Sequence, residues 1–347
     1  MNEFIRCNLF SDKAFKVQDR FVVKQKELVL DRELTNGKSS FNKAIIDYKC
    51  QWLRQNDWQT RPTFIIPIRD SSELLQITIK NFQEHGIDKL FNIIVVDDRS
   101  IEDIKKITIM NNLSYLRIDN DKGFNFSMLN NIPCKICFEL GVETVIFWNA
   151  DLWHAKKAWF LELLERHYRD KSVVSGSKLL YPPASMSLCG EDDTANIKEN
   201  FKTKLGDWRE TVQFGGDGWI AIAERDSMLI YTPCHSLRFQ KADNPRVNCD
   251  RGSLFVTGAL HVWNLEAFIQ LGGFNPTLSK NFQDSDICLR LYKGGICPMY
   301  YGKDIFFYHD ESAVLSKYNK KDKQFRSDEI IFYKLWDKKL QEMIYGL

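Results

Sequence analysis

Acidic side chains follow two of the most apolar segments of this chain. Asp97 and Asp98 come directly after Phe91–Val96, and Asn149-Ala150-Asp151 comes directly after Glu143–Trp148. Carboxylate oxygens are the ligands that Mg²⁺ and Mn²⁺ prefer, and they also accept hydrogen bonds from hydroxyls and bases. Each acid taken singly could be a turn residue or a helix cap. Their repeated position at the end of an apolar run favours one shared binding site.

Two further groups could carry acid–base or metal chemistry. Asp284-Ser285-Asp286 opens a segment with helical spacing, and His309 follows the short apolar run Ile305–Tyr308. A carboxylate can take the proton of an attacking hydroxyl, and an imidazole can bind a metal ion. The alternatives are that Asp284 only caps its helix and that His309 is an ordinary surface histidine.

The segments that would position these residues alternate between two patterns. Continuous apolar runs at Thr63–Pro67, Phe91–Val96 and Glu143–Trp148 predict buried strands, and the spacing at Ser72–His85 and Met128–Leu140 predicts helices between them. This alternation is typical of a mixed, mostly parallel α/β sheet with helices on both faces. Ligands bind such sheets at the carboxyl ends of the strands, where the acidic residues stand.

Composition excludes several classes of protein. The chain has 347 residues, with 48 Lys and Arg against 46 Asp and Glu, so its net charge is only +2. A dedicated nucleic-acid binder usually has a larger basic excess, so we expect no nucleic-acid partner. The nine cysteines are scattered, the start does not resemble a signal peptide, and no apolar run approaches the roughly 20 residues needed to span a bilayer. We therefore expect reduced thiols and a cytoplasmic location.

The sequence also predicts three parts. Residues 1–60 form a polar extension with a helix at Asn42–Leu53, residues 61–312 form the main domain, and residues 313–347 form a tail with a helix at Asp328–Ile344. The segment between Tyr181 and Asp250 is irregular and long, as functional connections often are.

A basic run precedes the last helix and could give peripheral contact with the inner face of a membrane, although a solvated surface is the simpler interpretation. Its residues are Lys317, Lys320, Lys321, Lys323 and Arg326.

Six segments, in order along the chain, resemble the inverting nucleotide-sugar glycosyltransferases of the GT-A fold, in particular glycosyltransferase family 2. The segments are FIIPIRD at Phe64–Asp70, IIVVDDRS at Ile93–Ser100, KGFNFSMLNNI at Lys122–Ile132, VIFWNADLW at Val145–Trp153, VTGALHVWNLEAFIQLGGFNPTLSKNFQDSDICLRL at Val256–Leu291 and FYHDES at Phe307–Ser312. The resemblance implies a GT-A, Rossmann-like fold with N- and C-terminal helical extensions.

The resemblance also implies the roles of the strand-ending residues. Asp151 matches the second residue of the D-x-D motif and would bind Mn²⁺ or Mg²⁺, and His309 matches a residue that adds a metal ligand or contacts the diphosphate. The expected contacts to the donor nucleotide are Pro67, Asp97, Asp98 and Asn149. The donor would be a nucleotide sugar, with a UDP-sugar as the first guess.

On the acceptor side, Asp284 matches the catalytic base of an inverting transfer. Asp286 is the second candidate for the base, but it would more simply support its helix by pairing with Arg290, one turn later. Gly258 and His235 are the other expected acceptor-side residues. The resemblance implies a glycan, or a lipid-linked glycan precursor, as the acceptor, and a role in polysaccharide biosynthesis.

Two positions depart from the family pattern. Asn149 stands where the first Asp of D-x-D is usual, and Gln283 replaces the usual Glu before the base. These changes leave open a second interpretation, a non-catalytic nucleotide- or glycan-binding protein that kept the fold. A sugar nucleotidyltransferase is disfavoured, because Pro67–Ser72 lacks the glycine-rich loop of that class.

Overall fold

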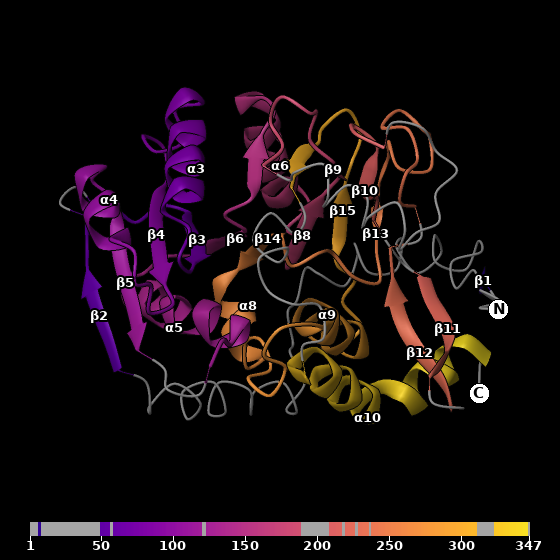
Figure 1. Cartoon of the computed structure of the whole chain (residues 1–347). Coiled ribbons are helices and arrows are strands. Elements are labelled where there is room, and N and C mark those ends of the chain that lie inside the picture. The colour runs from indigo at the N-terminus through magenta and orange to yellow at the C-terminus, as the bar shows by residue number, and fades with distance from the viewer. Residues whose placement is uncertain are drawn as a thin grey trace.

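The structure is a computed structural model that describes residues 6–7, 49–55, 58–119, 123–188, 208–216, 219–225, 228–235, 237–310 and 323–345. Figure 1 shows a central sheet with helices on both faces. Among the described residues the largest sheet has nine strands, in the order β13-β15-β8-β14-β6-β3-β4-β5-β2. These strands are β2 (Lys49–Leu53), β3 (Thr63–Ile68), β4 (Asn92–Asp97), β5 (Ser114–Asp119), β6 (Thr144–Trp148), β8 (Val174–Ser177), β13 (Asp250–Gly252), β14 (Leu260–Asn264) and β15 (Met299–Tyr301).

The sheet is mixed in direction, and its central part is parallel. Strands β6, β3, β4 and β5 run parallel to one another, whereas β14 pairs with β6 and β8 in the antiparallel direction. Strands β3, β4 and β6 are buried along almost their whole length, as the continuous apolar runs predicted. Because β3 lies between β4 and β6, the carboxyl ends of all three meet at one edge of the sheet.

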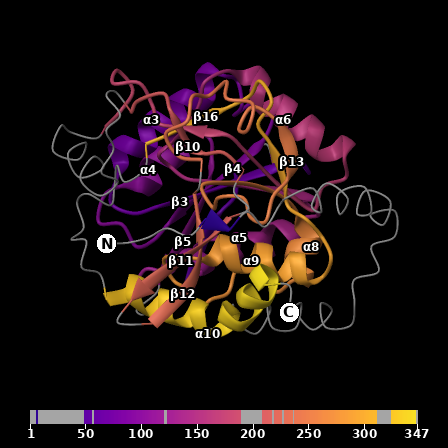
Figure 2. The same ribbon diagram turned by 90° about the vertical axis from the view of Figure 1, so that its right-hand side faces the viewer.

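Helices cover both faces of this sheet. Figures 1 and 2 place α3 (Ser72–Glu84) and α6 (Lys157–Arg169) on one side, and α5 (Phe126–Glu139), α8 (Leu265–Gln270) and α9 (Gln283–Lys293) on the other. Helix α4 (Ile104–Met110) packs against β4 and β5. The α/β architecture predicted from the sequence is therefore confirmed.

Residues Lys49–Leu53 correct one expectation. The sequence predicted a helix over Asn42–Leu53, but Lys49–Leu53 is the edge strand β2, antiparallel to β5 from Lys49 opposite Asp119 to Leu53 opposite Tyr115. The open edge of β5 offers a ladder of backbone hydrogen bonds, and Trp52 packs against the main core. Such tertiary pairing overrides a local helical spacing. Residues 42–48 lie outside the described part of the chain.

Two smaller sheets and a long helix complete the described structure. One sheet has the order β10-β9-β16-β7, and the other has the order β1-β11-β12. Their strands are β1 (Arg6–Cys7), β7 (Leu152–His154), β9 (Leu179–Leu180), β10 (Val212–Phe214), β11 (Trp219–Arg225), β12 (Met228–Cys234) and β16 (Phe307–His309). The expected C-terminal helix is present as α10 (Lys323–Tyr345), which lies against β12 (Figure 2).

No helix in the described ranges combines the length and the apolar character needed to cross a membrane. The basic run that could contact a membrane falls mostly outside those ranges, because residues 311–322 are not described. Membrane contact and location in the cell therefore stay predictions. The division into parts at residues 60 and 312 also stays a prediction, although β2 adds part of the N-terminal segment to the main sheet.

Candidate active site

Asp151, His309 and Asn149 come together at the carboxyl edge of the sheet. Asp151 lies between the end of β6 and the start of β7, and β16 pairs with β7 so that His309 stands opposite Leu152. The Nε2 atom of His309 lies 3.2 Å from Asp151 Oδ1 and 3.5 Å from the side-chain nitrogen of Asn149. Both Asp151 and His309 are largely buried, with 13% and 9% of their side chains exposed. The juxtaposition that the sequence predicted for these residues is thus present.

The other ring nitrogen of His309 contacts a residue from β10. His309 Nδ1 lies 2.9 Å from Gln213 Oε1, and the Gln213 side chain is almost completely buried. With the Nδ1 proton donated to that oxygen, Nε2 is the nitrogen that faces Asp151. Only a weak sign of this contact is visible in the sequence, since Gln213 lies in the long segment between Tyr181 and Asp250 that was expected to be functional.

The donor atoms of this cluster suit a hard divalent cation. Two ligands at right angles, each about 2.1 Å from an ion, lie about 3 Å apart, close to the separation of His309 Nε2 and Asp151 Oδ1. A carboxylate oxygen and an imidazole nitrogen are both accepted by Mn²⁺, and phosphates and water can complete its shell. Within the described ranges no cluster of three or more His, Cys, Asp or Glu residues could hold a metal alone. The residues present therefore fit an ion that is shared with a phosphate ligand.

Both carboxylate oxygens of Asp97 accept hydrogen bonds from other residues of the chain. Its Oδ1 accepts the backbone N–H of Ser100 at 2.7 Å. Its Oδ2 accepts the Tyr115 hydroxyl at 2.6 Å and Arg117 Nη1 at 2.9 Å. The geometry therefore makes Asp97 a support for the loop after β4. The expectation that it contacts the nucleotide directly has no support in this arrangement.

Asp98 has an oxygen left for a ligand. Its side chain is only 1% exposed, yet its Oδ2 accepts no hydrogen bond from the described residues. Arg69 Nη1 lies 3.5 Å from Oδ2, and Arg99 Nε lies 3.3 Å from Oδ1. Burial raises the pKa of the Asp98 carboxyl, and the two arginines oppose that change. A buried oxygen that accepts no hydrogen bond is costly, so Asp98 Oδ2 has accepting capacity that these residues do not use. Its expected contact with the nucleoside stays a prediction.

The loops after β3 and β4 are tied to each other. The Asp70 N–H donates to Ser100 Oγ at 3.0 Å, and the Ile101 N–H donates to Asp70 Oδ1 at 2.6 Å. Asp70 and Arg99 both have positive φ angles, 44° and 54°. Such backbone conformations in non-glycine residues concentrate at functional sites. Pro67, one residue before the end of β3 and opposite Val96 of β4, stands beside these loops.

Asp284 reaches the same edge from the opposite side. It lies in the first turn of α9, and its Oδ2 accepts the Gly258 N–H at 2.8 Å while its Oδ1 accepts the Ser285 N–H at 2.7 Å. The next residue, Ala259, accepts the Asn149 N–H through its carbonyl at 3.1 Å. A single turn of backbone, residues 258–259, therefore connects the expected base to the end of β6. The backbone N–H of Gly258 holds the Asp284 carboxylate. The expected contact of Gly258 with the acceptor stays a prediction.

Asp286 is the structural member of its pair. Its Oδ2 accepts Nε and Nη2 of Arg290, at 3.0 Å and 2.9 Å, and its Oδ1 accepts Trp336 Nε1 at 2.8 Å. The predicted pairing with Arg290 is confirmed. Asp286 is buried and ion-paired with Arg290, whereas Asp284 is partly exposed, so the geometry does not favour Asp286 as the base or as an acceptor contact.

Helix α10 also holds the loop that leads to Asp284. The buried carboxylate of Asp328 accepts the N–H groups of Lys280 and Asn281 at 2.6 Å and 3.0 Å, and the Ser279 hydroxyl at 3.2 Å. Nothing in the sequence pattern indicated this contact, because Asp328 lies in the polar tail. It makes the C-terminal helix part of the support of the site.

His235 contacts the backbone of Gln213, the residue whose side chain meets His309. Its Nδ1 is 3.2 Å from the Gln213 carbonyl oxygen, and its ring meets the Phe214 ring edge-on with centroids 5.3 Å apart. His235 therefore contacts β10, the strand that carries Gln213. Its expected role on the acceptor side stays a prediction.

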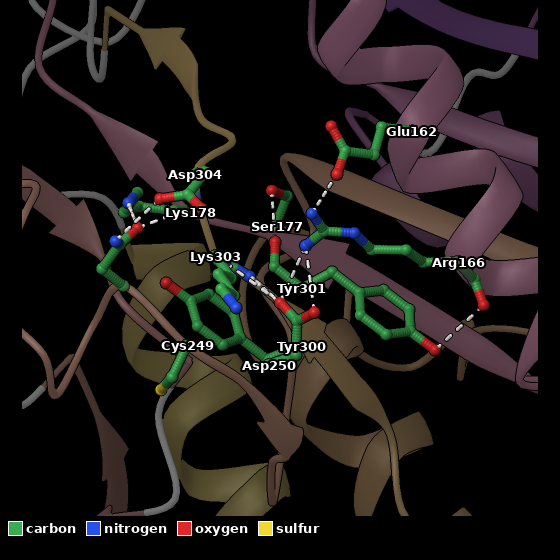
Figure 3. Close-up of polar contacts among 12 residues, drawn as sticks. Glu162, Arg166, Ser177, Lys178, Cys249, Asp250, Tyr300, Tyr301, Lys303 and Asp304 are labelled. Atoms are coloured by element: carbon green, nitrogen blue, oxygen red, sulfur yellow. Dashed lines mark hydrogen bonds and ion pairs between the residues drawn. The ribbon is translucent and has the colours of Figure 1, made fainter.

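The sequence predicted an irregular segment between Tyr181 and Asp250, but the structure places β10, β11 and β12 there. A second polar cluster holds the residues that lead into β13 (Figure 3). Arg166 Nη1 reaches both carboxylate oxygens of Asp250, at 2.9 Å and 3.0 Å. Lys178 is buried and donates to the Ala242 carbonyl at 2.8 Å and to Asn248 Oδ1 at 2.9 Å. Burial lowers the Lys178 pKa to about 8. The charged groups of Arg166, Lys178 and Asp250 all have partners within this cluster, so we assign it a structural role.

Comparison with known proteins rests on structure alone. No protein-family model matches the chain, and no curated protein matches its sequence. The fold is similar to the crystal structure of GalNAc-T7 with UDP, GalNAc and Mn²⁺, with a TM-score of 0.52 and 13% identity over 82% of this chain. The match covers 50% of the GalNAc-T7 chain, so this chain spans about half of that protein.

More distant similarities have TM-scores below 0.5 and add no weight. They include S. aureus TarS 1–349, at 0.47 with 13% identity over 82% of this chain and 69% of TarS. The mannosyltransferase PcManGT from Pyrobaculum calidifontis, in complex with GDP-Man and Mn²⁺, scores 0.43 with 11% identity over 90% of this chain and 83% of that one. The chain has a GT-A-like glycosyltransferase fold. Membership of family 2 stays a prediction.

Proposed function

We propose that this protein is an inverting glycosyltransferase that moves a sugar from a nucleoside-diphosphate donor to a hydroxyl of a glycan or a lipid-linked glycan precursor. The observation that carries the proposal is the connection of Asp284, through Gly258 and Ala259, to Asn149 at the end of β6. It joins the proposed base to the pair that would hold the cation, and the proposed inverting transfer uses both.

The donor would lie along the carboxyl ends of β4, β3 and β6. Asp98 would accept a hydrogen bond from the nucleoside through Oδ2, which accepts none from the described residues. Asp151 and His309 would hold Mn²⁺ or Mg²⁺ beside the diphosphate. A divalent ion there neutralises the charge that develops on the leaving phosphate. Asn149 can still accept a hydrogen bond through its amide oxygen, although it brings no charge to the site.

Asp284 would act as the general base. The N–H groups of Gly258 and Ser285 fix its carboxylate, and the start of α9 favours a negative charge there. The base removes the proton of the acceptor hydroxyl as that oxygen attacks the anomeric carbon, on the face opposite to the leaving diphosphate. Attack from the opposite face inverts the configuration of the sugar.

The second candidate function is a binding protein without catalysis. The observation in its favour is Asn149, which lowers the negative charge next to the cation pair. The positions of Asp151, His309 and Asp284 favour the enzyme. For the nucleoside of the donor we propose uridine.

A thermal-shift screen tests the proposed function. UDP, GDP, CDP and ADP are each added with Mn²⁺, with Mg²⁺ or with EDTA. A ligand that binds only the native state raises the melting temperature. We expect one diphosphate to do so, and only with the metal. No shift with any nucleotide and metal would contradict both donor binding and the enzyme interpretation.

A further inference from the structure

We propose that Gln213 is a positioning residue that fixes the proton of His309 on Nδ1 and so presents Nε2 to the cation held with Asp151. The role toward the metal ion rests on the proposed function. The contact between Gln213 and His309 does not, because it is present in the structure. Gln213 belongs to β10, far from His309 in sequence, and none of the motifs that suggested the site includes it.

The contact joins two buried polar groups. Gln213 is 2% exposed and its Oε1 lies 2.9 Å from His309 Nδ1. The strand order β10-β9-β16-β7 explains how they meet, since β9 has only two residues and leaves His309, at the end of β16, within reach of the β10 side chain. The Gln213 backbone is held separately, because its carbonyl lies 3.2 Å from His235 Nδ1.

The chemistry follows from the two nitrogens of the imidazole ring. A neutral ring has one N–H and one lone pair, and only the lone pair can bind a metal. An amide oxygen at Nδ1 requires the proton there, which leaves Nε2, 3.2 Å from Asp151 Oδ1, as the ligand. Partners on the second nitrogen set the tautomer and ring orientation of metal-binding histidines, and losing such a partner weakens metal affinity about 10- to 100-fold.

Three variants separate positioning from packing. Gln213→Leu keeps the size but removes the acceptor. Gln213→Glu keeps an acceptor at the same distance. Val212→Ala is the matched control, because Val212 is the neighbouring buried residue of β10 and packs in the small apolar cluster with Leu180, Leu237 and Val247. It should lower the melting temperature without changing the His309 contact.

The first measurement needs no metal. Histidine labelled with ¹⁵N is observed by NMR, and a His309→Ala spectrum assigns the signals. We expect a slowly exchanging Nδ1–H of His309 in the wild type, in Gln213→Glu and in Val212→Ala, and its loss in Gln213→Leu. A wild type without that proton, or a Gln213→Leu protein that keeps it unchanged, would overturn the inference.

The second measurement is Mn²⁺ affinity in the presence of UDP, by calorimetry. Gln213→Leu should bind Mn²⁺ about 10-fold more weakly or worse, with Gln213→Glu and Val212→Ala close to the wild type. Equal losses in Gln213→Leu and Gln213→Glu, or in Val212→Ala, would show a packing role and overturn the inference. If the wild type bound no Mn²⁺ with any nucleotide, the proposed function and the metal role of Gln213 would fail together. If the Nδ1–H signal of His309 were nevertheless intact, the contact with Gln213 would stand and only the proposed function would be refuted.

Discussion

His309 Nε2 lies 3.2 Å from Asp151 Oδ1, although the two residues are far apart in the sequence. Pairing of β16 with β7 produces this contact, and the Asp310 N–H, which donates to the Asp151 carbonyl at 2.9 Å, strengthens it. The two side chains thus converge on one point at the edge of the sheet. Three predictions test what that edge does, and a fourth tests the buried charge of Lys178.

Asp151→Ala should remove most of the metal-dependent binding of nucleoside diphosphate, because one of the two protein ligands is lost. Titration calorimetry with and without Mn²⁺ measures the effect. Asp103→Ala is the matched control, since Asp103 caps α4 by accepting the Lys106 N–H. The control should lose about 1 kcal/mol of stability and keep its nucleotide affinity. Unchanged Mn²⁺ dependence in Asp151→Ala would refute the metal assignment.

Asp98→Ala should raise the dissociation constant of the nucleotide about tenfold or more, since a hydrogen bond to a charged group contributes about 1.5–3 kcal/mol. Asp97→Ala should act differently. It leaves Arg117 and Tyr115 without their shared partner and should lower the free energy of unfolding by about 3 kcal/mol.

Urea unfolding and calorimetry on both variants separate these effects. Nucleotide affinity equal to that of the wild type in Asp98→Ala would remove the proposed nucleoside contact.

Asp284→Asn should bind nucleotide and metal normally but lose transfer by about 10²-fold or more, because the amide cannot accept a proton. Asp286→Asn should weaken the contacts with Arg290 and Trp336 and lower stability, with transfer affected less. Transfer rates are compared with nucleotide affinities for both variants. If Asp284→Asn were active and Asp286→Asn inactive, Asp286 and not Asp284 would be assigned as the base.

The lowered pKa of Lys178 should make the free energy of unfolding depend on pH in the alkaline range. Its folded pKa is lowered to about 8, below its ordinary value of about 10.4. Between these values the unfolded chain binds more protons than the folded one, so the free energy of unfolding rises with pH. Relative to Lys178→Met, the wild type should therefore gain stability from about pH 8 to about pH 10.4. Urea unfolding of both proteins across this range checks the sign, and a constant difference would contradict the buried charge.

Much of the fold and part of the site could be predicted from local pattern. Buried parallel strands are continuous apolar runs, so β3, β4 and β6 were visible in the sequence, and their polar ends located Asp98 and Asp151. The helical spacing of α5 and α9 was equally visible. These features depend on neighbours within a few residues, which a sequence displays directly.

The remaining features depend on pairs that are distant in sequence. Lys49–Leu53 became a strand because β5 had an open edge, and Asp97 binds Arg117 from the next strand. Gln213 met His309 only through the order of four short strands, and α10 supports the loop before Asp284 through Asp328. No periodicity records such contacts, because each is set by tertiary packing.

The most direct test of the central claim is the release of nucleoside diphosphate from a panel of nucleotide sugars, measured with Mn²⁺ and again with EDTA. Water can replace the acceptor in this assay, so the acceptor need not be known. We expect the wild-type protein to release diphosphate from one donor class, and EDTA to abolish the release. Absence of release from every donor, with no nucleotide raising the melting temperature, would contradict the account.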